Sequence, residues 1–169
     1  MNATLQSWNK ADEESALDAM IACCGSRRWA AAMVAKRPIG SIVDLSVAAD
    51  QIWSTMEEAD WMEAFACHPR IGERKAEQAS MQSIAWSLEE QSLSASAEER
   101  VLAELAAGNM IYEKRFGFTY IVCATGRSAE EMLEILNRRL KNDRIAELRE
   151  AAEEQRQITQ IRLGKWLVE

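Results

Sequence analysis

Apolar residues recur at every third or fourth position along most of the chain, the spacing that places them on one face of an α-helix. The first such stretch follows Asp12 and stops at Gly25, so we predict a helix that the aspartate caps and the glycine ends. The same pattern predicts further helices at about 28–36 and 41–53. Alternating patterns typical of strands are almost absent.

A fourth predicted helix leads to the only histidine of the chain, His68. Asp60 is expected to cap this helix, and Trp61, Phe65 and His68 follow at spacings that place them on one face. Pro69 disfavours helical geometry in the residue before it, so the helix should end at or just before His68. At that end the negative pole of the helix dipole favours a charged imidazole.

The second half of the chain continues the helical pattern, with one interruption. Helices are predicted at about 97–115, then after Ser128 as a cap, and finally after Asp143 as a cap. The segment FTYIVCAT at 118–125 is the one β-like run, and it has no second strand to pair with. We expect it to be a buried extended connector whose backbone amides and carbonyls need partners.

Length and composition are typical of one globular domain. The chain has 169 residues, of which 48% are hydrophobic, enough to close a single core without disulfides or metal. Residues that favour helix, such as Ala, Leu, Glu and Arg, dominate the sequence. We therefore expect an all-α protein, a single-domain multi-helix bundle over residues 1–169 with one buried extended connector.

The charge of the chain restricts its partners. A formal net charge of −7, with both signs mixed along the sequence, argues against nucleic acid and an anionic membrane surface. No run approaches the roughly 20 apolar residues that span a bilayer, and no signal peptide or peroxisomal tripeptide is recognised at the ends. We expect a cytoplasmic protein with a small-molecule substrate and no nucleic-acid or membrane partner.

The four cysteines, Cys23, Cys24, Cys67 and Cys123, lack the two-residue gap of a zinc or redox motif and are expected to be reduced thiols. One histidine is too few for a usual catalytic zinc site, so no metal is expected. Cys67 adjoins His68, which leaves a thiol-dependent enzyme as an alternative, although successive residues at a helix end diverge.

Several polar residues are candidates for chemistry, and each has a structural alternative. His68 lies where a helix gives way to a loop and can face a cavity, but lone histidines are more often structural. Ser87 and Glu90 can line a site or form a capping box, in which case Gln91 is merely exposed. Arg162 falls within the apolar sector of the last helix, where it needs an anionic partner unless it reaches water.

Four segments are more informative together than singly. They are HPRIG at 68–72, SLEEQ at 87–91, YEKRFGFTYIVCATG at 112–126 and IRL at 161–163. In order and content they resemble the 2-oxo-4-hydroxy-4-carboxy-5-ureidoimidazoline (OHCU) decarboxylases of urate degradation. The likeness begins near Trp8 and extends to the last helix, so it covers nearly the whole chain.

The resemblance implies an all-helical, homodimeric enzyme that converts OHCU to (S)-allantoin in purine catabolism without a cofactor. His68 matches the catalytic acid of the family, Ser87, Glu90 and Gln91 match residues that line the site, and Arg162 matches an arginine of the last helix. The remaining implied ligand contacts are Pro69, Tyr120, Ile121, Val122, Cys123 and Ala124.

These residue types suit the reaction. Loss of carbon dioxide from a carbon next to an imine leaves electrons that the ring delocalises, so no pyridoxal or metal is needed as a sink. An imidazole exchanges protons near neutral pH, and Glu90 within reach would set its tautomer as a second catalytic group. Arg162 would pair with a substrate oxygen, and the connector backbone would offer hydrogen bonds to a flat polar ring. The alternative is a non-catalytic helical domain that binds a ligand or a protein.

Overall fold

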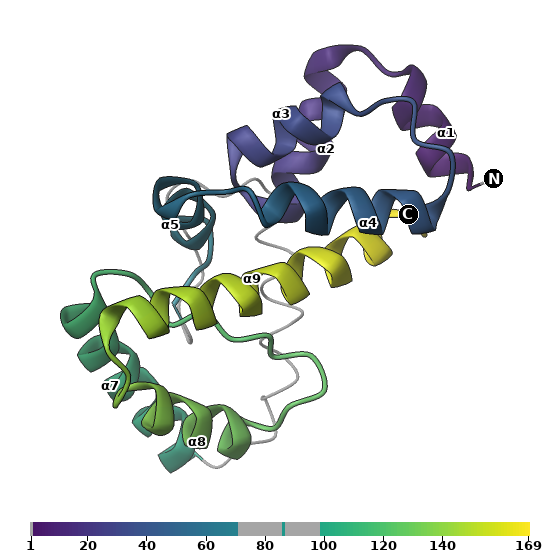
Figure 1. The fold of residues 1–169 in the computed structure, drawn as a ribbon. Helices are drawn as coiled ribbons and strands as arrows, with labels where there is room; N and C mark the ends of the chain where they lie inside the picture. The colour runs from purple at the N-terminus through teal and green to yellow at the C-terminus, as the bar shows by residue number, and fades with distance from the viewer. Residues whose placement is uncertain (1, 71–85, 87–98) are drawn as a thin grey trace. The chain divides into compact units, whose positions relative to one another are not determined.

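The computed structural model describes residues 2–70, 86 and 99–169. Within these ranges the chain forms eight α-helices and no strand (Figure 1). The helices are α1 (Ala3–Lys10), α2 (Glu13–Cys24), α3 (Arg27–Ala35), α4 (Ile42–Trp53), α5 (Glu58–Ala66), α7 (Glu99–Phe116), α8 (Ala129–Arg139) and α9 (Arg144–Trp166). The predicted all-α class is confirmed over this part of the chain.

The chain divides into two compact units. The first comprises Met1–Ala64 with Arg156–Glu169, and the second comprises Phe65–Gln155. The long helix α9 contributes its first part to the second unit and its last part to the first unit. The single domain over residues 1–169 therefore stays a prediction.

Local capping chemistry fixes both ends of α2, as the sequence predicts, and the start of α4. Asp12 caps α2, because its carboxylate accepts the backbone amide of Ser15 at 2.8 Å. Gly25 ends the same helix in the left-handed conformation, with φ of 89°. Ser41 caps α4 by accepting the amide of Asp44 at 3.1 Å.

One helix of the first unit, α1, was not predicted. Asn2 caps it, and Trp8 buries its ring and donates from Nε1 to the carbonyl of Ala16 at 2.9 Å. A helix of only eight residues shows barely two turns of the apolar period. Its stability comes from packing rather than from a pattern visible in its own sequence.

The last part of α9 lies beside α4 in the first unit (Figure 1). Gln160 donates to Asp50 at 2.7 Å and to the carbonyl of Ser46 at 3.0 Å, and Arg156 donates to Asp50 at 3.0 Å. These bonds set the rotation of this part of α9. The side of α9 that faces α4 is therefore partly polar.

Asp60 does not cap α5, which corrects one prediction. The helix begins at Glu58, so Asp60 is its third residue, and its carboxylate accepts the amide of Glu57 at 2.9 Å. An acidic side chain at this position reaches back to the amide ahead of the helix, as in half of a capping box. The other end agrees with the sequence, because α5 stops at Ala66, two residues before His68.

In the second unit, α7 and α8 pack against each other. Gly108 of α7 is buried, and a Cβ atom at this residue would lie 2.6 Å from Leu136 of α8. Gly117 ends α7 with φ of 85°. Ser128 and Glu131 form a capping box at the start of α8, and Asp143 caps α9 by accepting the amide of Ala146 at 2.8 Å.

Between α7 and α8 the segment 118–125 runs as a loop without strand pairing, drawn in green in Figure 1. Phe118, Tyr120, Ile121 and Cys123 are buried. The connector therefore turns these four side chains into the unit, although there is no sheet. The predicted burial of the connector is confirmed.

Candidate active site

His68 follows the end of α5, and its half-buried side chain lies in the second unit. Its backbone amide donates to the carbonyl of Phe65 at 3.1 Å, which extends the helical turn. Its Nε2 atom lies 2.7 Å from Oε1 of Gln155 on α9. Pro69, the next residue, is buried. Hydrogen bonds thus fix both the backbone and the imidazole ring of His68.

Three side chains from three helices bind the backbone of the connector. Asn109 of α7 accepts the amide of Tyr120 at 3.0 Å, and Arg139 of α8 donates to the carbonyl of Ile121 at 2.6 Å. Glu154 of α9 then accepts the amide of Cys123 at 2.6 Å. The buried backbone was expected to find its partners in a ligand. At these three groups, protein side chains supply them.

Arg139 belongs to a fully buried ionic cluster. It donates from Nε to Oε1 of Glu147 at 2.7 Å, and neither side chain is exposed to solvent. Tyr112 donates its hydroxyl to the same carboxylate, and burial raises its pKa, so it remains a donor at neutral pH. The Arg139 guanidinium also lies 4.9 Å from the centre of the Tyr120 ring. The connector is therefore anchored to charged groups shielded from water.

Glu154 and Gln155 are consecutive residues with different partners. Glu154 bonds the connector at Cys123 and also accepts from Arg127 at 2.7 Å, a bond that raises the pKa of this arginine. Gln155, which is 0% exposed, bonds the imidazole of His68. One turn of α9 thus contacts both the connector and the histidine.

Sequence reasoning missed Gln155, although a signal was present. Ala151 and Ala152 precede it by four and three positions, and Thr159 follows it by four, and all of these are buried. A glutamine in the middle of a buried helical stripe requires a hydrogen-bond partner. That argument identifies Gln155 as a candidate but does not name the partner.

Arg162 lies in the first unit and is 1% exposed. The prediction that this guanidinium turns into the core is therefore confirmed. It lies near the buried thiol of Cys23, whose pKa is raised by burial and lowered to a smaller extent by Arg162. Cys23 stays a neutral thiol at physiological pH, which excludes it as a ready nucleophile.

Three predicted site residues, Ser87, Glu90 and Gln91, lie outside the described residues. Among the residues that are described, all four cysteines are buried thiols outside any disulfide, and no group of three potential ligands could hold a metal ion. No helix in the same ranges is both long and apolar enough to cross a bilayer.

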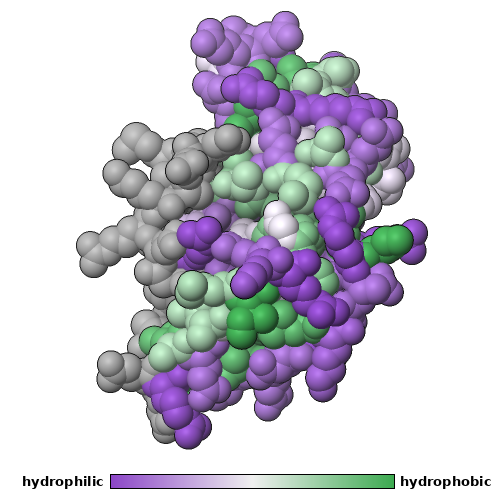
Figure 2. Space-filling model, turned by 90° about the vertical axis from the view of Figure 1, so that its left-hand side faces the viewer, coloured by the Kyte–Doolittle hydropathy of each residue, from purple (hydrophilic) through white to green (hydrophobic). Residues whose placement is uncertain are grey.

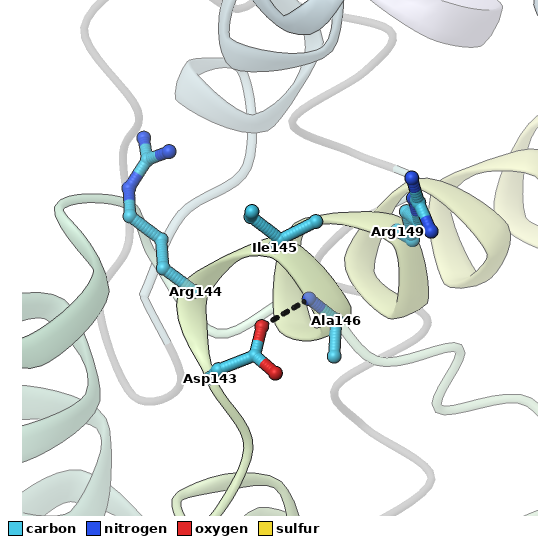
Figure 3. Close-up of a pocket in the computed structure, with 5 residues that line it drawn as sticks. All are labelled: Asp143, Arg144, Ile145, Ala146 and Arg149. Atoms are coloured by element: carbon cyan, nitrogen blue, oxygen red, sulfur yellow. Dashed lines mark hydrogen bonds between the residues drawn. The ribbon is translucent and has the colours of Figure 1, made fainter.

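A pocket of about 490 Å³ opens at the start of α9. Figure 3 shows Ile145 between the guanidinium groups of Arg144 and Arg149, with Asp143 bonded to the amide of Ala146 below them. Of the predicted site residues that the structure describes, none lines this pocket.

Comparison with known proteins decides the family. The family model described as OHCU decarboxylase matches residues 9–164. The chain belongs to the OHCU decarboxylase family. The resemblance inferred from the four sequence segments is thereby confirmed.

Members and relatives of the family from distant organisms match most of the chain. The uric acid degradation bifunctional protein TTL of Arabidopsis thaliana is 39% identical over 144 residues, which cover 85% of this chain and 44% of that protein. The chain therefore spans less than half of this relative. A 2-oxo-4-hydroxy-4-carboxy-5-ureidoimidazoline decarboxylase of Haloferax volcanii is 26% identical over 163 residues, 96% of this chain and 95% of the relative.

Solved structures show the same fold. The structure described as OHCU decarboxylase in the presence of (S)-allantoin is 36% identical, with a TM-score of 0.77, covering 90% of this chain and 99% of that chain. A structure described as (S)-allantoin synthase matches with a TM-score of 0.69 at 16% identity, covering 96% of this chain and 53% of that chain. At that identity the second likeness concerns the fold alone.

Proposed function

We propose that this chain decarboxylates OHCU and yields (S)-allantoin, without a cofactor. The main support is membership of the OHCU decarboxylase family over residues 9–164. Further support comes from the likeness, at 36% identity, to a structure described as OHCU decarboxylase in the presence of (S)-allantoin.

His68 is the proposed proton donor, with Glu90 as the second catalytic group. The carbon–carboxylate bond breaks and carbon dioxide leaves, while the electron pair forms a ring carbon–carbon double bond and the neighbouring imine nitrogen takes up a proton. The hydroxyl on the carbon that lost the carboxylate then gives up its proton and becomes a carbonyl, and a proton reaches one face of the former imine carbon, which becomes the stereocentre. An imidazole on a fixed backbone, whose ring is held by a buried amide, suits this delivery.

Substrate binding is proposed for Pro69, Ser87, Gln91, Arg162 and the connector at 120–124. A buried arginine is suited to pair with a substrate oxygen. A connector whose backbone is fixed by side chains is preorganised to read a flat polar ring through its remaining amides and carbonyls.

One buried atom of the connector supports a polar ligand beside it. The Thr119 hydroxyl is shielded from solvent and has no hydrogen-bond partner among the described residues. Proteins seldom leave such a group unsatisfied, and a ligand or water would bond it.

We also propose a homodimer and keep the cytoplasmic location as a prediction. Large apolar side chains reach the surface of both units, among them Val43 at 69% and Met110 at 71% exposure. Green apolar areas interrupt the hydrophilic surface in Figure 2. Such areas are common at protein interfaces. Sedimentation equilibrium at several concentrations tests the dimer, and a monomer throughout would refute it.

The activity is tested with freshly generated OHCU, by following the circular dichroism of allantoin as it forms. The expected result is faster decay than the spontaneous reaction and an excess of the (S) product. Replacing His68 with Asn should lower the rate about a hundredfold or more. The exposed Gln51, changed to Glu, serves as a control that should keep the full rate. A wild-type rate equal to the spontaneous rate would refute the function.

A further inference from the structure

We infer that Gln155 is a positioning residue for His68, which fixes the rotation of the imidazole and keeps its proton on Nε2. The inference rests on the proposed function for its catalytic meaning. The contact itself belongs to the second unit alone, since both residues lie within Phe65–Gln155.

The hydrogen-bond geometry carries the assignment. Nε2 of His68 lies 2.7 Å from Oε1 of Gln155, an oxygen that can only accept. With this amide oxygen as the acceptor, the ring nitrogen donates, so the inferred imidazole carries a proton on Nε2 in both its neutral and its charged form. The proton that distinguishes the two forms then resides on Nδ1.

The buried environment gives this contact its strength. Gln155 is 0% exposed, and its side chain starts from the middle of the long helix α9. Because Glu154 on the same turn bonds the amide of Cys123, a rotation of this turn would break the connector bond as well. The position of the amide oxygen is thus fixed by the same helix that anchors the connector.

A neutral amide also differs from the usual carboxylate partner of a catalytic histidine. A carboxylate at this site would favour the charged imidazole, whereas an amide orients the ring with little bias in charge. We therefore expect Gln155 to set the geometry of His68 and to add little bias of its own to the charge of the imidazole.

The single histidine makes this inference directly measurable. In protein labelled with ¹⁵N-histidine, the two ring nitrogens of His68 give the only imidazole signals, because the chain has one histidine. The expected wild-type spectrum shows a protonated Nε2 with a slowly exchanging hydrogen. In Gln155→Leu this hydrogen should exchange rapidly, and in Gln155→Glu it should persist while the pKa of the imidazole rises.

Kinetics separate positioning from a merely structural role. Gln155→Leu should lower kcat about tenfold with little change in KM, because the acid is misaligned while the substrate contacts remain. Gln155→Glu should retain more of kcat than Gln155→Leu and shift the pH profile upwards. The matched control is Gln51→Glu, the same substitution at an exposed position of α4. It should leave the spectrum, the pH profile and kcat unchanged.

Several results would overturn the inference. One is a wild-type ring with its proton on Nδ1, and another is a Nε2 hydrogen that exchanges equally fast in wild type and Gln155→Leu. Unchanged kcat in a folded Gln155→Leu would do the same. Should this variant fail to fold by circular dichroism, the spectrum and pH profile of Gln155→Glu decide instead. The NMR measurements do not require catalytic activity. An inactive wild type would therefore refute the proposed function, while the spectra would still test the contact between Gln155 and His68.

Discussion

Arg139 should be the residue of α8 whose loss unfolds the second unit most readily. Its guanidinium is fully buried, bonds the buried Glu147, and donates to the carbonyl of Ile121. Replacing it with Met leaves a carboxylate without its cation and a buried carbonyl without its donor. Breaking one side of a buried ion pair costs about 3–5 kcal/mol, and the lost bond to the carbonyl contributes to that range.

We expect Arg139→Met to lower the free energy of unfolding by about 4 kcal/mol, which corresponds to a fall in Tm of about 8–16 °C for a chain of this size. The double variant Arg139→Met, Glu147→Leu removes both charges and should recover at least about half of the loss. Urea and thermal unfolding, followed by circular dichroism, measure both quantities.

The neighbouring arginine provides a matched control. Arg138 pairs with Glu150 at the surface, and its side chain is 58% exposed, so Arg138→Met should cost about 0.5 kcal/mol. The reasoning fails if Arg139→Met costs no more than this control. It also fails if the double variant is as unstable as the single one, because the buried unpaired charge would then not be the cause.

Two further predictions concern packing and pH. Gly108→Ala should lower the free energy of unfolding by about 1–3 kcal/mol, because the added Cβ would lie 2.6 Å from the buried Leu136. Gly164→Ala in α9, where the added Cβ meets open space, should raise it by up to about 1 kcal/mol. Urea titrations of both variants measure the difference. The hydrogen bond from Arg138 lowers the pKa of Glu150, so this pair contributes stability above the ordinary glutamate pKa and loses it as pH falls through the lowered value. The difference in Tm between wild type and Arg138→Met should therefore be present at pH 7 and fade below about pH 4. A difference that grows on acidification would contradict the linkage.

Local chemistry explains which parts of the fold could be predicted from the sequence. Asp12, Ser128 and Asp143 cap the helices they were expected to cap, because a cap depends on residues within one turn. The predicted cap at Asp60 was wrong by three positions, since Asp60 is the third residue of the helix and its side chain accepts the amide of Glu57 ahead of the helix. The short α1 depends on packing and has no such local signal.

Partners distant in sequence explain what could not be predicted. The chain indicated a buried connector but not that Asn109, Arg139 and Glu154 would bond its backbone. Similarly, the sequence directed attention to His68, while Gln155 is 87 positions away. Periodicity shows that a polar residue is buried, but only the packing of helices decides which group it meets.

The central proposal is that His68 and the connector, which both belong to the second unit, bind one substrate molecule. A crystal structure of the protein with (S)-allantoin tests it most directly. We predict that the imidazole of His68 and backbone groups of 120–124 lie within hydrogen-bond distance of the same ligand. A ligand bound out of reach of His68 or of the connector would contradict the account.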